Sequence, residues 1–181
     1  MLEADPRVGA IHLVISGSGL KVLRAELNLD VSRTADIATA LVGAPARKTE
    51  YLLDSDVGAS IASGSYRTDG MVVIPCSTGC LAQIAQGISS TLIERAADVC
   101  LKEGRKLVLA VRDTPLSRIH LENMLRAQQA GAVIFPIIPS FYHSPETIQD
   151  LVTQFCCRVL ARIDLRQDKQ FEWEGERRSP A

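Results

Sequence analysis

Four apolar stretches recur along the chain, and small or polar residues and then a helix-like pattern follow each of them. The stretches are Ile11–Ser16, Met71–Pro75, Lys106–Arg112 and Ala132–Ile137. Continuous apolar runs of this length are typical of strands buried on both faces, and the repeated order of strand, loop and helix is typical of a parallel sheet covered by helices. The pattern therefore predicts an α/β domain built on a parallel sheet.

Helices are predicted from 3.6-residue periodicity and from residues that start or stop a helix. We expect helices over Ser89–Gly104, Ser117–Gly131 and Ser144–Ile163. In the last of these, Ser144 is expected to cap the helix and Pro145 to occupy its first turn. The segment Leu29–Ser60 is polar and weakly periodic, so no element is predicted there.

The two ends of the chain differ from its middle. The opening residues resemble the end of a helix that leads directly into the first predicted strand. After Asp164 the sequence is charged, and we expect an extended or disordered tail in which Phe171 and Trp173 are candidates to dock on another surface. We therefore divide the chain into one domain, 1–165, and a tail, 166–181.

Composition narrows the function classes. Hydrophobic residues make up 46% of the 181 residues and aromatic residues 4%, which indicates an aliphatic core, and the net charge of −1 argues against a broad basic surface for nucleic acid. No apolar run is long enough to span a membrane, and the polar start "MLEADPR" is not a signal peptide. The five cysteines and three histidines lack the spacing of a zinc site or disulfide framework, so we expect no metal and a cytoplasmic location.

Polar and small residues gather where the four predicted strands end. Ser16 follows the first strand, Ser77–Gly79 the second, Arg112 and Asp113 the third, and Ser140–His143 the fourth. In open α/β sheets, ligands bind outside the carboxyl ends of the strands, and a helix that starts there offers unpaired N–H groups to an anion. The sequence therefore predicts an anion-binding site at this edge of the sheet.

Several of these candidates also have a structural interpretation. Ser77 is an ordinary type of helix cap, and Cys80 is more often a small buried apolar residue than a nucleophile. Asp113 fits a structural ion pair or a cap as well as a tuned acid–base group.

The candidates on helices are open to both interpretations too. Glu26 and Arg95 fit solvent-facing helix positions, where Arg95 would pair with a neighbouring carboxylate. Tyr142 fits simple packing at a turn. Arg158 lies in an apolar helix stretch and therefore needs an anionic partner, for which another subunit is one source.

Three long segments, in order, resemble the flavin prenyltransferases, the UbiX-type enzymes. They are "SGSYRTDGMVVIPCSTGCLAQIAQG", "LIERAADVCLKEGRKLVLAVRDTPLSRIHLENML" and "GAVIFPIIPSFYHSPETIQDLV", and the likeness extends from Ile11 to Ile163. The related cysteine decarboxylases share the fold but carry a Pro-Ala-Ser-Ala-Asn motif, which this sequence lacks.

The resemblance implies a three-layer, flavodoxin-like or Rossmann-like domain that assembles as a dodecamer. It implies reduced FMN and dimethylallyl phosphate as substrates, which are joined at flavin N5 and C6 to make prenylated FMN for a partner decarboxylase of the UbiD type. It implies no metal. Two alternatives are a flavin-binding or scaffold relative without turnover and a flavin-dependent cysteine-type decarboxylase.

The same resemblance implies roles for individual residues. It implies FMN contacts at Ser16, Ser77, Thr78, Gly79, Cys80 and Arg112. It implies catalytic roles for Glu26, near the reacting centre, and for Asp113. It also implies that neighbouring subunits complete a cluster for the phosphate of the prenyl donor, made of Arg95, Lys102, Tyr142 and Arg158.

The sequence departs from the family pattern in two places. The family's N-terminal strand and Gly-Ala-Ser-Gly loop, which carries a catalytic serine and donors for the FMN phosphate, have no counterpart before Ile11. Asp113 stands where the family usually has glutamate, and one methylene of displacement weakens catalysis at a tightly positioned site. We therefore expect an N-terminally shortened domain, weaker FMN binding and low turnover by the chain as written.

Overall fold

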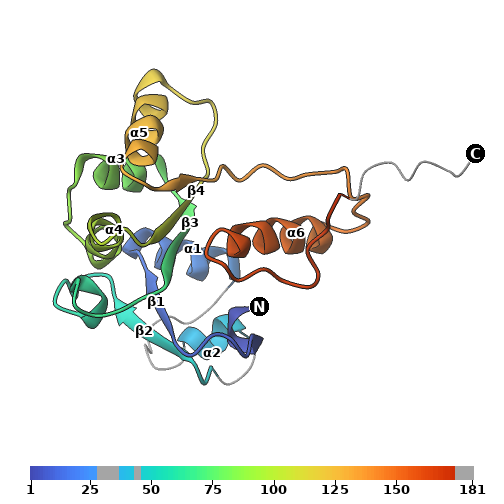
Figure 1. Cartoon of the computed structure of the whole chain (residues 1–181), viewed down its shortest axis with the longest axis horizontal. Coiled ribbons are helices and arrows are strands. Elements are labelled where there is room, and N and C mark those ends of the chain that lie inside the picture. Colours follow the sequence, from blue (N-terminus) through green and yellow to red (C-terminus); the bar gives the residue numbers. More distant parts are fainter. Residues whose placement is uncertain (28–36, 43–45, 174–181) are drawn as a thin grey trace, which may run out of the picture.

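The computed structural model describes residues 1–27, 37–42 and 46–173, which form helices packed around two parallel sheets (Figure 1). One sheet pairs β1 (Ile11–Ile15) with β2 (Thr49–Leu53). The other contains, in spatial order, β3 (Gly70–Cys76), β4 (Lys106–Val111) and β5 (Val133–Ile134). All of these pairings are parallel, so the predicted α/β fold is confirmed.

The helical segments connect these strands and cover them. In chain order they are the 3-10 turn η1 (Leu2–Ala4), α1 (Gly17–Leu27), α2 (Ile37–Val42), the 3-10 turn η3 (Ser60–Ala62), α3 (Thr78–Gln86), α4 (Leu92–Lys102), α5 (Arg118–Gln129) and α6 (Ile148–Ala161). Helices α3 and α5 pack on each other, and α4 packs on β1, β3 and β4. None of the helices in the described residues is both long and apolar enough to cross a bilayer.

The hydrophobic core is centred on β4, the middle strand of the three-stranded sheet. Leu107 and Leu109 on β4 are completely buried, and they belong to one cluster with Leu81 of α3 and Ala97 of α4. Burying one leucine side chain contributes about 1.5–3 kcal/mol relative to leaving it exposed. Because β4 is covered on both faces, its sequence is an unbroken apolar run rather than an alternating one.

Helix α4 links the two sheets. Asp54, the residue after β2, holds its first turn: the Asp54 carbonyl accepts the Leu92 N–H at 2.8 Å, and the Asp54 carboxylate accepts the Ile93 N–H at 3.2 Å. The same helix packs on β3 and β4 of the other sheet. Within the described residues, β1 pairs only with β2 and β3 only with β4, so one edge of each strand has no strand partner.

The predicted start of the last helix is wrong. Helix α6 begins at Ile148 because Thr147 caps it: the Thr147 hydroxyl accepts the Asp150 N–H at 3.1 Å, and the Asp150 carboxylate accepts the Thr147 N–H at 2.9 Å. Ser144 instead has a φ of 52°, outside the right-handed helical region. Ser144 and Pro145 therefore lie in the turn region before the helix, and they do not cap it.

The strand predicted over Ala132–Ile137 is paired as a regular ladder only over Val133–Ile134. Extended backbone continues beyond it, because the Phe135 N–H donates to the Leu109 carbonyl at 2.9 Å and the Ile137 N–H donates to the Val111 carbonyl at 2.8 Å. Pro136, between them, has no N–H to donate. The fourth predicted strand therefore lies beside β4 as expected, although its regular part is short.

The region without predicted elements contains α2 and β2, while 29–36 and 43–45 lie outside the described residues. Strand β2 is exposed at Glu50 and Leu53 and only partly buried elsewhere. A half-buried edge strand lacks the continuous apolar run that revealed the others. This explains why the sequence pattern missed it.

The opening residues form a short 3-10 turn that is fastened to the start of β2. The Glu3 carboxylate accepts the N–H groups of Arg47 at 2.6 Å and Lys48 at 2.8 Å, and it also accepts the Thr49 hydroxyl at 2.6 Å. One carboxylate thereby satisfies three donors on the segment that leads into β2. The first residues, whose sequence resembles the end of a helix, thus form a single 3-10 turn that holds the start of β2 in place.

Asp5 connects the opening residues to the segment after α6. Its buried carboxylate accepts the Arg7 guanidinium at 2.6 and 2.9 Å and the Gln167 side-chain amide at 2.9 Å. Arg7 also donates to the Arg166 carbonyl at 2.7 Å. These donors, the Arg7 guanidinium first and the Gln167 amide second, hold the pKa of Asp5 well below its usual range.

The segment after α6 runs back along that helix as turns and extended backbone. The Gln154 side chain donates to the Lys169 carbonyl at 2.7 Å and accepts the Phe171 N–H at 2.7 Å. The Phe171 ring then lies 5.6 Å from the Tyr142 ring. The structure thus places Phe171 against the rest of the chain, while Trp173 remains largely exposed.

Replacing Asp5 by asparagine should lower the thermal unfolding temperature by several degrees at pH 7 and by a smaller amount near pH 3. A carboxylate with a depressed folded-state pKa stabilises the fold above its unfolded pKa of about 3.9, and this contribution is lost as the pH falls toward the folded-state value. Circular dichroism melts from pH 7 to pH 3 measure the difference, with the exposed Asp69→Asn as the matched control. An equal loss at both pH values would contradict an ionic role for Asp5.

Candidate functional site

Serines begin the helices that follow β1 and β3. The Ser77 hydroxyl accepts the Cys80 N–H at 3.2 Å, and the Ser77 carbonyl accepts the Leu81 N–H at 2.9 Å. Ser16 repeats the arrangement on α1, with its hydroxyl accepting the Gly19 N–H at 3.1 Å. Both serines are therefore helix caps, and each lies at the positive end of a helix, where an anion is favoured.

The Ser77 loop is joined to the end of β4. The Arg112 N–H donates to the Cys76 carbonyl at 3.1 Å, so the residues after β3 and β4 lie side by side. One residue further on, the Asp113 carboxylate accepts the Thr78 hydroxyl at 2.9 Å. We call this set of neighbouring residues the strand-end cluster: Ser77, Thr78, Gly79, Cys80, Arg112 and Asp113.

Asp113 is held as an ionised carboxylate. The Thr78 hydroxyl and then the Thr114 N–H, which donates at 2.9 Å, lower the pKa of Asp113 below its usual range. A carboxylate with a lowered pKa stays charged at neutral pH and is poorly suited to donate a proton. In this structure Asp113 therefore connects two loops, which favours a positioning role over general acid catalysis.

The strand-end cluster fits a flavin phosphate or flavin edge by the chemistry of its donors. In the first turn of α3, Ser77 accepts the N–H groups of Cys80 and Leu81. The N–H groups of Thr78 and Gly79 remain available at the tip of the helix. A Cβ added to Gly79 would meet nothing closer than the Ser77 hydroxyl at 3.9 Å, so the space in front of it is open. Backbone N–H groups on an open helix tip, beside an exposed arginine, are suited to an anionic ligand.

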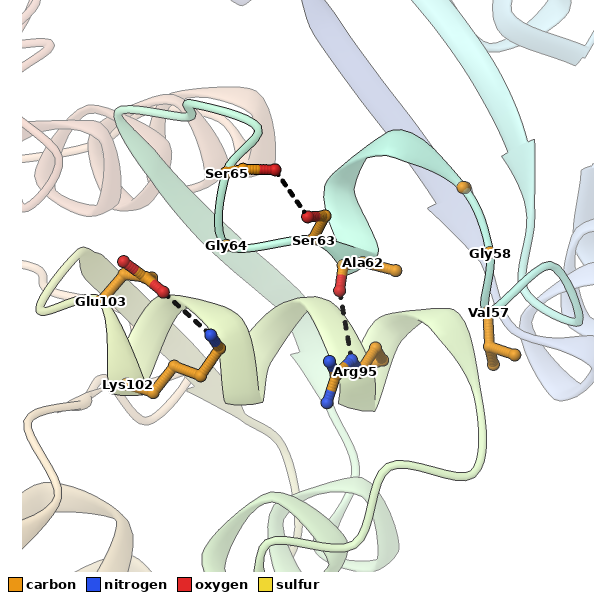
Figure 2. A pocket seen from close by; sticks show the side chains of 10 residues that line it. Val57, Gly58, Ala62, Ser63, Gly64, Ser65, Arg95, Lys102 and Glu103 are labelled. Atoms are coloured by element: carbon orange, nitrogen blue, oxygen red, sulfur yellow. Dashed lines mark hydrogen bonds and ion pairs between the residues drawn. The ribbon is translucent and has the colours of Figure 1, made fainter.

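A second polar hollow, the α4 pocket, lies between α4 and the segment that contains η3 (Figure 2). Its volume is about 520 Å³, and its lining is Val57, Gly58, Ala59, Ala62, Ser63, Gly64, Ser65, Arg95, Lys102 and Glu103. Arg95 and Lys102 are seven residues apart on α4, so they lie two turns apart on one face of the helix. The pocket thus presents two cations and the hydroxyl groups of Ser63 and Ser65.

Both cations of the α4 pocket have partners that a stronger anion could replace. Arg95 donates to the Ala62 carbonyl at 3.1 Å and to Asp98 at 3.3 Å. Lys102 pairs with Glu103 at 2.8 Å, and this hydrogen bond lowers the pKa of Glu103. Surface pairs of this kind contribute about 0–1 kcal/mol. Neither pair is therefore a strong obstacle to phosphate binding.

Glycine at position 64 allows the α4 pocket to close around Lys102. A Cβ at this position would lie 2.2 Å from the Glu103 Oε1 atom and 2.8 Å from the Lys102 Nζ atom. The atoms it would meet are the ends of flexible side chains, so a larger residue would displace the ion pair rather than the backbone. Gly64 therefore helps to set where the Lys102 ammonium group lies.

The other two residues assigned to the donor phosphate lie elsewhere in the chain. Tyr142 packs against His143 and Phe171 and lines a hollow of about 280 Å³ with Phe171 and Trp173. The Arg158 guanidinium lies 5.6 Å above the Phe135 ring. No hydrogen bond or ion pair among the described residues joins Tyr142 or Arg158 to Arg95 or Lys102, and Tyr142 lines a different hollow. The structure therefore does not assemble the four residues into one cluster within a single copy.

Glu26 also stands apart from the strand-end cluster. It is exposed on α1, near the end of the part of that helix that the structure describes. Ser16 and Glu26 thus share α1, at opposite ends, and the described contacts do not connect Glu26 with Asp113.

Two acidic residues near the site escaped the sequence analysis. Glu94 is buried, and its carboxylate accepts the Ser90 N–H at 2.8 Å and the Thr91 N–H at 3.1 Å. Asp54 holds the first turn of α4 as described above. Thr91 and Glu94 are three residues apart and form a capping-box pattern. That sequence signal would have identified Glu94.

Comparison with known proteins places the chain among flavoproteins. The flavoprotein family model matches residues 7–159. The UbiX flavin prenyltransferase of Halalkalibacterium halodurans is 41% identical over 167 residues, which cover 92% of this chain and 81% of the relative. The UbiX flavin prenyltransferase of Neisseria meningitidis serogroup B is 43% identical over 176 residues, with 92% and 93% coverage.

Solved structures show the same relationship. A crystal structure of AnUbiX (PadA1) in complex with FMN and dimethylallyl pyrophosphate has a TM-score of 0.80 and 41% identity, covering 91% of this chain and 82% of that one. A dodecameric, FMN-dependent UbiX-like decarboxylase from Escherichia coli O157:H7 has a TM-score of 0.82 and 42% identity, with 96% and 88% coverage.

Replacing Thr78 by valine should raise the pKa of Asp113 toward about 3.9, the ordinary value for aspartate. Valine keeps the shape of threonine but removes the hydroxyl that donates to the carboxylate. Thr78→Ser is the matched variant that keeps a donor, and it should leave the pKa near that of the unmodified chain. Carboxyl-carbon NMR titrations of the three proteins compare the values, and an unchanged pKa in Thr78→Val would show that the hydrogen bond does not form in solution.

Proposed function

This chain belongs to the flavin prenyltransferase family, and on that premise we propose that it transfers a dimethylallyl group from dimethylallyl phosphate to reduced FMN. The observation that carries this proposal is the strand-end cluster, in which Ser77 caps an open helix tip beside Arg112. We infer that the product, prenylated FMN, serves a partner decarboxylase of the UbiD type. We infer a cytoplasmic location, consistent with free thiols at all five cysteines.

The strand-end cluster is proposed to hold the FMN. The exposed tip of α3, with the N–H groups of Thr78 and Gly79, and the Arg112 side chain would contact its anionic or electron-rich parts. Ser16, as the cap of α1, offers a second helix tip that follows a neighbouring strand. When bound, reduced flavin supplies N5 and C6 as the acceptor atoms. The residues of this chain orient it and keep the reacting face dry.

The α4 pocket is proposed to bind the phosphate of the donor. Breaking the carbon–oxygen bond of dimethylallyl phosphate leaves negative charge on the phosphate, and Arg95 and Lys102 stabilise that charge. Tyr142 and Arg158 are proposed to contact the same phosphate from another copy of the chain. Arg95 and Lys102 line one hollow and Tyr142 lines another, which supports this arrangement, and the dodecameric Escherichia coli relative offers a precedent. We therefore propose a homo-oligomer, with a dodecamer as the expected size.

The two carboxylates receive different roles. Glu26 is exposed and forms no hydrogen bond with the other described residues, so it is proposed to accept a proton during the transfer. Asp113 is charged and already bonded to Thr78 and Thr114, so we propose that it aligns the strand-end cluster and contacts the flavin rather than donating a proton. Proton transfer by a positioned group contributes about 10²–10⁴-fold to a rate.

Glu26→Gln should reduce prenyl transfer by about a hundredfold or more while FMN binding is retained, because the amide keeps the shape but cannot accept the proton. Fluorescence quenching of FMN measures binding. The spectral change of reduced FMN with dimethylallyl phosphate, without oxygen, measures transfer. Glu122→Gln on α5 is the matched control, and the Neisseria relative is the positive control.

The outcomes of this experiment separate the alternatives. Turnover by the chain as written is expected to be below that of the Neisseria relative, because Asp113 is shorter than the family's glutamate. Saturable FMN quenching without any product would favour the flavin-binding relative without turnover. Quenching that never saturates at high micromolar FMN would reject the flavin site itself.

Arg95→Gln and Lys102→Gln should each raise the KM for dimethylallyl phosphate by about tenfold, since a hydrogen bond to a charged group is worth about 1.5–3 kcal/mol. The FMN dissociation constant should remain unchanged, because the α4 pocket is proposed for the donor alone. Arg118→Gln removes another paired surface arginine and serves as the control. If both variants weakened FMN binding and left the KM unchanged, the two assigned ligands would have to be exchanged.

A further inference from the structure

Two thiols bracket the Ser77 loop. Cys76 is the last residue of β3 and is completely buried, while Cys80 lies in the first turn of α3 and is partly exposed. Cys80 packs against the core cluster that contains Cys76, and the pKa of each thiol depends on the other. The Cys76 sulfur also lies 3.6 Å from the Ser77 carbonyl oxygen. The flavin contacts assigned to this loop therefore lie between two neighbouring sulfur atoms.

The helix cap keeps the two thiols together. The Ser77 hydroxyl fixes the Cys80 N–H, and the Ser77 carbonyl fixes the N–H of Leu81. Cys76 and Leu81 are both fully buried in the same core cluster, one just before the cap and the other in the first turn, which is the arrangement of a hydrophobic staple. The approach of Cys76 to Cys80 is thus built into the way β3 enters α3.

The two thiols differ in their chemistry. Interaction with the Cys76 thiol lowers the pKa of Cys80. The same interaction, followed by burial, raises the pKa of Cys76. A position in the first turn of a helix also favours a thiolate. Cys80 is therefore the partly exposed nucleophile, and Cys76 is the protected thiol behind it.

We propose that Cys76 and Cys80 form a reversible disulfide when the protein meets a peroxide. The Cys80 thiolate attacks hydrogen peroxide, so that the sulfur becomes a sulfenic acid and hydroxide leaves. Cys76 then attacks that sulfur, a sulfur–sulfur bond forms, and the proton of Cys76 leaves with the hydroxyl group as water. The net reaction consumes two thiols and one peroxide and yields one disulfide and two waters.

The disulfide would change the surface of the strand-end cluster. The Cys80 sulfur would be drawn toward the buried Cys76 and away from the exposed side of α3, and the first turn of the helix would be tied covalently to β3. The inference that this affects flavin binding rests on the proposed function. The formation of the disulfide itself does not, because it depends only on the two thiols and the cap.

The remaining cysteines provide internal comparisons. Burial raises the pKa of Cys100, Cys156 and Cys157, so none of the three is predisposed to react with peroxide. Trypsin cuts after Arg67 and Arg95, and the peptide between them carries Cys76 and Cys80 and no other cysteine. Oxidation of the pair is therefore visible as the loss of two hydrogen atoms from one peptide.

The experiment treats the full chain, free of FMN, with hydrogen peroxide, blocks the remaining thiols and maps the tryptic peptides by mass spectrometry. We expect the peptide 68–95 to lose two hydrogens about tenfold faster than the other cysteine peptides are oxidised, because thiolate character sets the rate. Dithiothreitol should restore it fully. FMN should slow the loss severalfold, and disulfide formation without such protection would contradict the flavin site while leaving the disulfide proposal standing.

Variants distinguish the disulfide from general damage. Cys80→Ser should abolish the two-hydrogen loss, whereas Cys76→Ala should leave a sulfenic acid on Cys80 that dimedone traps. Cys156→Ser should leave the loss unchanged. The proposal is overturned if the peptide 68–95 of the unmodified chain gains only oxygen, or if another cysteine peptide reacts first. Circular dichroism of each variant verifies that it is folded.

Discussion

The arrangement of this molecule depends on the hydrogen bonds that Asp54 accepts from the first turn of α4. They join the sheet of β1 and β2 to a helix that packs on β3 and β4. Buried Glu94 completes the start of that helix by accepting two backbone N–H groups. Because α4 is fixed at its beginning, Arg95 and Lys102 face the segment around η3 at defined positions.

The two surfaces that we propose to bind anions follow from different parts of this framework. The strand-end cluster results from the alignment of β3 with β4, whereas the α4 pocket results from the packing of η3 on α4. A reaction between two phosphate-bearing substrates needs both surfaces near one point. Figure 1 shows that the segment between β5 and α6 extends away from the two sheets, and Tyr142 of this segment lines a hollow with Phe171 and Trp173. This arrangement fits the proposal that separate copies supply separate parts of the site.

The sequence predicted those parts of the fold whose signal is local. Strand β4 is an unbroken apolar run, and Ser117 caps α5, which begins at Arg118, close to the predicted start, because a cap is a short-range feature. The cap expected at Ser144 was wrong because a serine–proline pair fits a turn as well as a helix start. The residues of the site were predicted from the family resemblance. The hydrogen bond between Thr78 and Asp113 was not predicted, because it joins two strand ends that are 35 residues apart in the sequence. Such a contact depends on the strand register, which no local pattern encodes.

The strands form two sheets, and the two sheets differ in how readily they open locally. Strand β4 is buried on both faces and lies between two partners, so its amides would be released only when most of the domain unfolds. Strands β1 and β2 are only partly buried, and within the described residues no ladder connects them with β3. Local opening of β1 and β2 should therefore need less free energy than opening of β4. Ser16, which follows β1, thus lies on the more flexible side of the edge where the strands end. Ser77, which follows β3, lies on the more rigid side.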